Sequence, residues 1–264
     1  MRKLALVEVL FVLLIVPRVL FAHDNPDELH FSHPLITESP SPDTKIRLDY
    51  FYQHFNDGAS ANDHTPRVEY EYAFRPSFSI AATVPYTFRT VEGLPSSSHT
   101  DNIEVALKLA SFALKDHHVL PFYGVSFELP TGSDAKEIGS GHIVVIEPYF
   151  GFGLKKEKVE FVGFSSVGVP TNKNSTDDDD THLGYQFSAL FKPRPSFQAL
   201  IELDGETLLA GPQSGQTVVN LSPGIKFLPP SNEHWQIGVS VGFPVTNAQE
   251  FKTRVVASAF YHFK

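Results

Sequence analysis

The sequence predicts an all-β fold, a transmembrane antiparallel β-barrel of about 12 strands. Three observations lead to this prediction. Apolar and polar residues alternate over stretches of about nine to twelve residues, the length that a tilted strand needs to cross a bilayer. The connections between these stretches are long and short in turn. The composition also favours strands, because 23 Phe and 9 Tyr occur among 264 residues and helix-forming runs are rare.

Residues 1–22 are predicted to be an export signal. Arg2 and Lys3 precede the apolar run Leu4–Val16, and Ala22 ends a sequence at which a signal peptide would be cleaved. A retained membrane anchor is the alternative, but a spanning helix needs roughly 20 apolar residues, and this run is interrupted by Glu8 and followed by Pro17 and Arg18. We therefore expect an exported protein of the bacterial outer membrane.

Residues 23–43 form an extended periplasmic lead-in to the barrel. Its four prolines, at positions 26, 34, 40 and 42, argue against a helix or an interior strand. We expect the segment to be mobile or to lie along the periplasmic rim. No metal site is predicted at its His30 and His33, nor at His117 and His118, because neither pair has a third ligand at a fixed spacing.

The barrel itself is expected to span residues 44–264. Each predicted strand has an apolar face for lipid and a polar face for the lumen. Arg67–Arg75 shows the cleanest alternation, and Val159–Val169 the weakest. In chain order the predicted strands are Lys45–His54, Arg67–Arg75, Phe78–Arg89, Ile103–Phe112, Val119–Leu129, His142–Leu154, Val159–Val169, His182–Phe191, Phe197–Leu203, Val218–Phe227, Trp235–Phe243 and Phe251–Phe263.

The last predicted strand carries an aromatic pair near the chain end, a common feature of outer-membrane barrels. Phe251, Val255, Tyr261 and Phe263 share its apolar face, and the rings of Tyr261 and Phe263 would lie at the lipid–water boundary. Positions between them, such as Arg254, would face the lumen.

Long polar connections follow the odd-numbered strands, and short ones follow the even-numbered strands. The long connections are Asn56–Pro66, Thr90–Asn102, Pro130–Gly141, Pro170–Thr181, Asp204–Gln216 and the shorter Pro244–Glu250. Bacterial barrels have short periplasmic turns and longer external loops, so both chain ends would be periplasmic. A soluble β-sandwich is the alternative, but its strands average only about five or six residues and its loops need not alternate.

The polar faces carry charges of both signs, which would line the lumen. Such charges on opposite walls create a transverse field that selects solutes by charge and polarity. The alternative is that they pair across the lumen and fill it. The candidate lumen-lining residues are Arg47, Asp49, Glu69, Glu71, Arg89, Glu104, Lys108, Glu128, Glu147, Glu202, Lys226 and Arg254.

Other classes of function have weaker support. The formal charge of −9 argues against nucleic acid, and the lack of Cys excludes disulfides and thiolate sites. Ser140 and His142 have the spacing of a nucleophile and a base on one strand, but no third group is identifiable. Asp177–Asp180 is more consistent with a solvated external loop than with a cation site. We predict no catalytic residue, no metal and no cofactor.

Three short segments resemble one known family. They are residues 33–38 (HPLITE), residues 79–86 (SIAATVPY), and residues 127–132 (FELPTG) followed by Gly-Ser-Gly at 139–141. They resemble the MetA-pathway of phenol degradation family of outer-membrane β-barrel proteins, often called transporters. The resemblance spans about residues 33–264 and implies a channel-like barrel associated with uptake of aromatic compounds. It supplies no catalytic residues.

Together these observations predict an outer-membrane channel for passive diffusion of small solutes, including aromatic or hydrophobic ones. Its expected partners are outer-membrane lipid and lipopolysaccharide, the barrel assembly machinery and a small-molecule solute. Two alternatives remain open: an outer-membrane barrel enzyme of the phospholipase or acylhydrolase kind, and a structural barrel with a blocked lumen.

Overall fold

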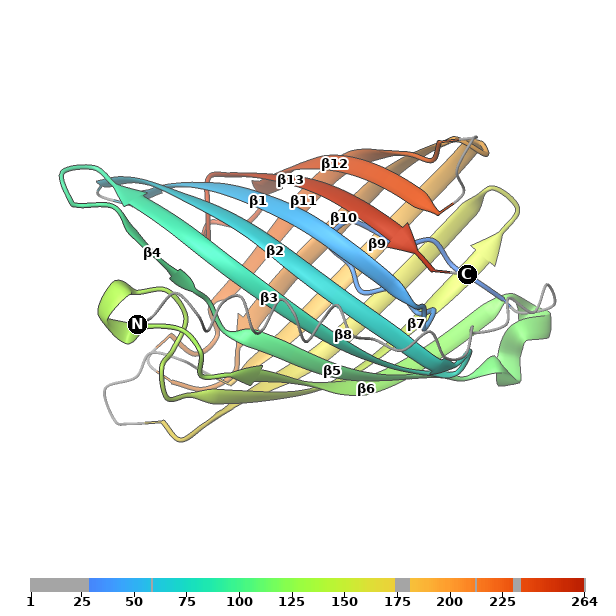
Figure 1. Ribbon diagram of the computed structural model, residues 1–264, viewed down its shortest axis with the longest axis horizontal. Coiled ribbons are helices and arrows are strands. Elements are labelled where there is room, and N and C mark those ends of the chain that lie inside the picture. Colours follow the sequence, from blue (N-terminus) through green and yellow to red (C-terminus); the bar gives the residue numbers. More distant parts are fainter. Residues whose placement is uncertain (1–28, 58, 174–180, 212, 230–233, 264) are drawn as a thin grey trace.

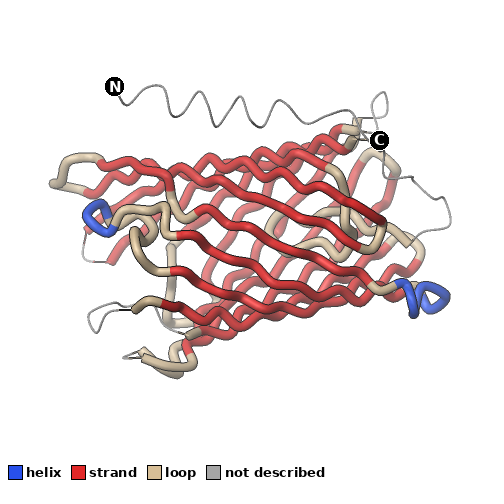
Figure 2. The backbone as a smooth tube through the Cα atoms, turned by 60° about the horizontal axis from the view of Figure 1, so that its bottom comes forward, coloured by secondary structure: helices blue, strands red, loops and turns tan. Residues whose placement is uncertain are grey.

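The described part of the chain forms one closed antiparallel β-barrel (Figures 1 and 2). The computed structural model describes residues 29–57, 59–173, 181–211, 213–229 and 234–263. The predicted export signal and Asp177–Asp180 lie outside these residues. The strands are β1 (Lys45–Asp57), β2 (Ala59–Arg75), β3 (Phe78–Val91), β4 (Ser97–Thr100), β5 (Ile103–Ala110), β6 (Val119–Leu129), β7 (Val144–Lys156), β8 (Val159–Thr171), β9 (His182–Arg194), β10 (Phe197–Leu208), β11 (Thr217–Phe227), β12 (Trp235–Pro244) and β13 (Thr253–His262).

Twelve of these strands make the wall, which confirms the predicted fold class. Each wall strand pairs with its neighbours in sequence, and β1 pairs with β13 from Lys45 opposite His262 to His54 opposite Thr253, which closes the cylinder. The short β4 pairs only with β3 and extends that hairpin beyond the wall. Two short 3-10 helices, η1 (Phe112–His117) and η2 (Asp134–Lys136), lie in connections. Among the described residues no helix has the length and apolarity to cross a membrane.

One predicted connection is wrong, because the segment Asn56–Pro66 belongs almost entirely to strands. β1 runs on to Asp57 and β2 begins at Ala59, with paired residues along the whole hairpin. Backbone hydrogen bonds form this ladder, so it continues where the apolar alternation has stopped. Pro66 lies within β2, and the pairing with β3 is interrupted between His64 and Arg67, as expected for a residue without an N–H donor.

Burial is inverted relative to a soluble protein. Large apolar side chains point away from the barrel axis, and Phe150 on β7 is 57% exposed. Charged side chains on the same strands point inward, and Lys226 on β11 is only 1% exposed. An apolar outer surface around a polar interior is the arrangement that a lipid bilayer requires.

The last strand follows this pattern with one exception. Arg254, Val256, Ser258 and Phe260 are buried inside, while Tyr261 stacks edge-on with Phe263 on the outside at 5.0 Å between ring centroids. Phe251 was expected outside but is buried beneath the Arg254 guanidinium, 4.7 Å from its ring. Phe251 precedes β13, which begins at Thr253, so the alternation of strand side chains does not determine which way Phe251 points.

The two mouths of the barrel differ. The turn end carries the connections β2–β3, β5–β6, β7–β8, β9–β10 and β11–β12, together with the start of β1 and the end of β13. The loop end carries the longer connections, including β6–β7 with η2.

Candidate functional site

The described part of the lead-in, residues 29–43, lies inside the barrel and fills the lumen at its turn end. From here on, the name lead-in refers to these residues. In Figure 1 the lead-in is the blue segment before β1, enclosed by the strands. Phe31, His33, Leu35, Thr37 and Ser39 are all buried. This placement differs from the expected position along the periplasmic rim. The prolines do keep the segment out of the sheet, but an extended chain that pairs with no strand can still pack within the cylinder.

Two apolar patches on the inner wall receive the lead-in. Phe31 packs with Leu120 and Phe122 of β6 and with Val162 of β8. Four residues later, Leu35 packs with Leu190, Leu200 and Phe260 from β9, β10 and β13, in a second patch. The lumen therefore contains a small hydrophobic core of its own, contributed by strands that are distant in sequence.

Two wall glycines allow this close approach. A Cβ atom on Gly153 of β7 would lie 2.7 Å from the Phe31 ring and 2.8 Å from Pro40. A Cβ atom on Gly238 of β12 would lie 2.5 Å from Leu35. Real Cβ contacts are not this short, so any larger residue at either site would push the lead-in away from the wall.

Side chains of the wall accept hydrogen bonds from the backbone N–H groups of the lead-in. The Glu202 carboxylate accepts hydrogen bonds from the N–H groups of Leu35, Ile36 and Thr37 at 2.8–3.2 Å. Glu160 accepts from the Ser32 N–H at 2.9 Å, and Gln186 accepts from the Glu38 N–H at 3.0 Å. A segment outside any sheet needs such partners when it is buried.

Cationic side chains bind the carbonyl groups of the same segment. Arg47 of β1 donates to the carbonyl of Leu35, and Lys226 of β11 donates to that of His33. Lys226 also donates to Gln236 at 2.8 Å, so its amino group has two hydrogen-bond partners. Wall residues from β1, β8, β9, β10 and β11 thus anchor one extended segment.

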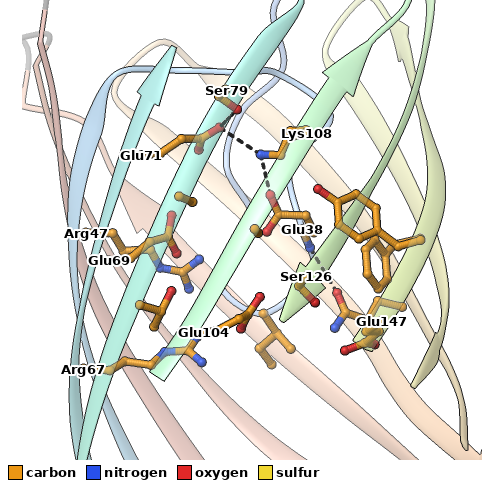
Figure 3. Close-up of a pocket in the computed structure, with 17 residues that line it drawn as sticks. Glu38, Arg47, Arg67, Glu69, Glu71, Ser79, Glu104, Lys108, Ser126 and Glu147 are labelled. Atoms are coloured by element: carbon orange, nitrogen blue, oxygen red, sulfur yellow. Dashed lines mark hydrogen bonds and ion pairs between the residues drawn. The ribbon is translucent and has the colours of Figure 1, made fainter. Parts of the chain in front are cut away.

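An ion-pair network joins the lead-in to strands β1, β2 and β5 of the wall (Figure 3). Lys108 of β5 bridges Glu38 of the lead-in and Glu71 of β2, with 3.1 Å between Nζ and Glu71 Oε1. Glu71 also contacts Lys45 and accepts a 2.6 Å hydrogen bond from Ser79. Lys45 in turn lies 2.9 Å from Glu69. These charges compensate one another, as buried charges must.

Three further charge clusters lie on the inner wall. Asp49 holds Arg47 at 2.8 Å and Arg67 at 2.9 Å. Asp204 binds Arg254 at 2.5 Å. Arg89 makes a two-point contact with Asp63 at 2.6 and 2.9 Å, close to the loop end. Most of these pairs join residues of one strand or of adjacent strands, and only the pair of Asp204 with Arg254 joins strands that are not neighbours, β10 and β13. The charges are therefore neutralised mainly along the wall.

The half of the lumen nearer the loop end has a different character, because three of its carboxylates, those of Glu104, Glu128 and Glu147, lie together without a Lys or Arg partner among the described residues. Glu104 of β5 stands opposite Glu128 of β6, and Glu147 of β7 lies opposite Ser126. Over the described residues, no Lys or Arg comes within ion-pair distance of these three carboxylates. An acidic wall of this kind attracts cations and repels anions.

Three cavities border these carboxylates. A cavity of about 910 Å³ opens at the loop end between Glu104, Glu128 and Arg67. A second cavity of about 190 Å³ lies deeper, between Glu104, Glu147 and the Glu38 side chain of the lead-in. A third, of about 180 Å³, borders Glu147 from the other side. The lead-in thus forms the floor of a charged vestibule.

The structure places the twelve candidate lumen residues in four groups. Arg47, Asp49, Arg89 and Arg254 belong to the charge clusters of the inner wall, and Glu69, Glu71 and Lys108 to the network of Figure 3. Glu202 and Lys226 hold the lead-in. Glu104, Glu128 and Glu147 line the vestibule.

Sequence reasoning missed one group of residues, the lead-in itself. Glu38 and the buried apolar pair Phe31 and Leu35 complete the interior, yet no strand pattern includes them. The spacing of that pair by four positions within a polar segment was the available signal. The spacing alone does not indicate an inward location.

Ser140 and His142 lie together near the loop end, joined by Asp134 of η2. Ser140 Oγ is 3.5 Å from His142 Nδ1 and 3.2 Å from Asp134, and Asp134 is 3.3 Å from the same Nδ1 atom. A hydrolase relay needs the serine and the carboxylate on different imidazole nitrogens. Here both contact Nδ1, and Ser140 Oγ also accepts the N–H groups of His142 and Ile143. The cluster therefore organises a turn, and it does not have the geometry of a catalytic triad.

The Asp134 carboxylate is the electrostatic centre of that turn. A hydrogen bond from the Gly141 N–H, assisted by His142 and Ser140, lowers the pKa of Asp134 below its usual value. The carboxylate form is thus the one that orders the loop at neutral pH.

Comparisons with known proteins show the fold. No family model matches the chain, and no curated protein matches its sequence. The barrel is similar to the COG4313 outer membrane channel from Pseudomonas putida F1, with a TM-score of 0.68 and 13% identity over 88% of this chain and 100% of that one. It is also similar to the KdgM porin (0.54, 11% identity, 83% and 99% covered) and the NanC porin (0.55, 8% identity, 83% and 98% covered). The chain thus has the fold of an outer-membrane β-barrel of the channel and porin type.

Proposed function

We propose that this protein is an outer-membrane channel through which small solutes diffuse passively. The observation that carries the proposal is a closed cylinder with an apolar exterior and a charged, cavity-containing interior. The solved structures with this fold include an outer membrane channel and two porins, which supports the same function. In this proposal the loop end faces outward and the turn end faces the periplasm, the orientation usual for bacterial barrels.

The solute would enter the vestibule first. Its acidic wall, formed by Glu104, Glu128 and Glu147, favours cations and neutral polar molecules over anions. The sequence resemblance to the MetA-pathway of phenol degradation family suggests aromatic or hydrophobic solutes as a further class. The rings of Tyr149 and Phe164 line the cavity above the lead-in and offer a surface on which such a solute could stack.

A structural barrel with a blocked lumen is the second candidate, and the lead-in is the observation that favours it. The segment fills the turn end and is held by Glu202, Arg47 and Lys226. Under the channel proposal, solutes pass beside the lead-in or during its transient displacement.

Single-channel recording in planar bilayers tests these two candidates against each other. The full-length protein is expected to give steady ionic currents that are small for its strand number, because the lead-in narrows the path. Swelling of proteoliposomes in small neutral solutes and in phenolic solutes would then define the solute class.

A complete lack of conductance and of swelling, in protein shown to be folded, would overturn the channel proposal and leave the blocked barrel. A phospholipase activity that depends on Ser140 would overturn both candidates.

A further inference from the structure

The lead-in contains a compact cluster of two histidines and one aspartate at the turn end. His33 Nε2 lies 2.5 Å from Asp43 Oδ2, and His30 Nε2 lies 3.0 Å from both oxygens of the same carboxylate. All three ligand-capable atoms lie within 4.8 Å of one another. The cluster is outside the ion-pair network and the vestibule, and the channel function does not use it.

The donor set is suited to a divalent transition metal. Two imidazole nitrogens and one carboxylate oxygen are ligands for Zn²⁺ and similar ions, with bonds of about 2.0–2.2 Å, and a water molecule would complete the coordination. Ligands around such an ion are somewhat farther apart than the 2.5 and 3.0 Å contacts seen here. Small rotations of the His30 and Asp43 side chains would be enough to admit the ion.

Burial and access also fit a metal site. The His33 side chain is only 3% exposed, so its orientation is fixed by packing, whereas that of His30 is 51% exposed and leaves an entry from the turn end. The His262 ring lies beside His33 at 5.0 Å between centroids and encloses the cluster on the barrel side.

Neighbouring cations do not prevent binding, because each is already paired. Lys45, the next charged residue after Asp43, contacts Glu69 at 2.9 Å and also touches Glu71. Lys155, which donates to the carbonyl of His30, lies 3.2 Å from Glu160. Each of these two lysines thus has a carboxylate partner other than Asp43.

We propose that His30, His33 and Asp43 bind one divalent transition-metal ion of the Zn²⁺ class, which ties the start of the lead-in to its last residue, two positions before β1. The ion would close residues 30–43 into a loop and so hold the lead-in within the barrel. The inference rests on this cluster alone and stands whether or not the barrel conducts solutes.

Cobalt titration of the purified full chain tests the proposal. The protein would be prepared in detergent without a polyhistidine tag and stripped with EDTA. Co²⁺ is then added while its visible absorption is recorded, since nitrogen and oxygen ligands in a protein site give bands stronger than those of the hydrated ion. We expect one equivalent to bind, and Zn²⁺ to displace it.

His33→Gln and Asp43→Asn are expected to weaken binding at least about tenfold, because each removes one of three protein ligands. The matched control is the double variant His117→Gln/His118→Gln, which alters two histidines of another turn-end connection and should bind as the wild type does. Heat-modifiable migration on gels reports whether each barrel is folded. If His33→Gln does not fold, His30→Gln replaces it, since that side chain is half exposed.

The proposal is overturned if Co²⁺ added to the folded wild type absorbs no more strongly than hydrated Co²⁺ in the same buffer. It is also overturned if His33→Gln and Asp43→Asn bind Co²⁺ as tightly as the wild type does. Loss of binding in the His117/His118 variant would place the ion at the β5–β6 turn and overturn it equally.

Discussion

The contact between Glu202 and the lead-in gives the sharpest prediction. Glu202 Oε1 accepts the N–H groups of Ile36 and Thr37 at 3.0 and 2.8 Å, and Oε2 accepts those of Leu35 and Ile36 at 3.1 and 3.2 Å. In Glu202→Gln, an NH₂ group replaces one oxygen and faces N–H donors. One to two charge-assisted hydrogen bonds are lost, which destabilises the docked lead-in by about 2–4 kcal/mol. The undocked population should rise about 30- to 700-fold.

Maleimide labelling of a single cysteine measures this population. The chain contains no Cys, so Ser39→Cys places the only thiol at a buried position of the lead-in. When opening and closing are fast relative to labelling, the labelling rate is proportional to the fraction of open molecules. The rate in folded, detergent-solubilised Ser39→Cys/Glu202→Gln should exceed that in Ser39→Cys by the same factor.

Glu206→Gln is the matched control, because Glu206 lies on the same strand but lines the cavity nearer the loop end. It should label at the rate of Ser39→Cys alone. Equal labelling of the Glu202→Gln and Glu206→Gln proteins would refute the reasoning that these hydrogen bonds hold the lead-in.

Three other predictions follow from the wall, the vestibule and the loop end. Phe150→Lys places a charge on the lipid face at the middle of β7 and should destabilise the barrel by about 2–4 kcal/mol in urea unfolding from lipid vesicles, whereas Phe150→Leu should cost much less. Glu104→Gln/Glu128→Gln removes two unpaired carboxylates from the vestibule and should shift the reversal potential in a KCl gradient toward zero, and an unchanged potential would contradict a selective role for the acidic wall. Asp134→Asn should speed proteolysis of the β6–β7 loop at neutral pH. Because the pKa of Asp134 is lowered in the folded loop, its contribution is present above the usual carboxyl pKa of 3.8 and is lost as the pH falls through the lowered value, so wild type and variant should converge in acid.

The wall of the barrel was predictable from sequence because the residues of each strand reflect the lipid and the lumen on its two faces. Lipid on one side and polar lumen on the other impose a period of two, which is visible in Val68, Tyr70 and Tyr72 against Glu69 and Glu71. The inward positions of residues such as Glu202 and Lys226 followed from this pattern. Strand limits beyond the apolar belt did not, since the β1–β2 ladder at Asn56–Pro66 needs only backbone hydrogen bonds.

The contents of the lumen could not be predicted in the same way. The lead-in has no period, and its partners Glu160, Glu202 and Lys226 are brought together only by the pairing of β8 to β11 in the folded sheet. The sequence also provided no third ligand at a fixed spacing from His30 and His33. In the structure the lead-in folds so that Asp43 lies next to both histidines.

The lead-in continues directly into β1, whose ladder with β13 joins the first strand to the last. The Phe263 N–H donates to the carbonyl of Thr44 at 2.9 Å, one residue beyond the end of the lead-in. Pairing of residues so distant in sequence is a slow, late event in assembly. The hydrogen bonds that seal the cylinder therefore also fix the point at which the chain leaves the lumen, so the seam of the barrel and the position of its internal segment depend on each other.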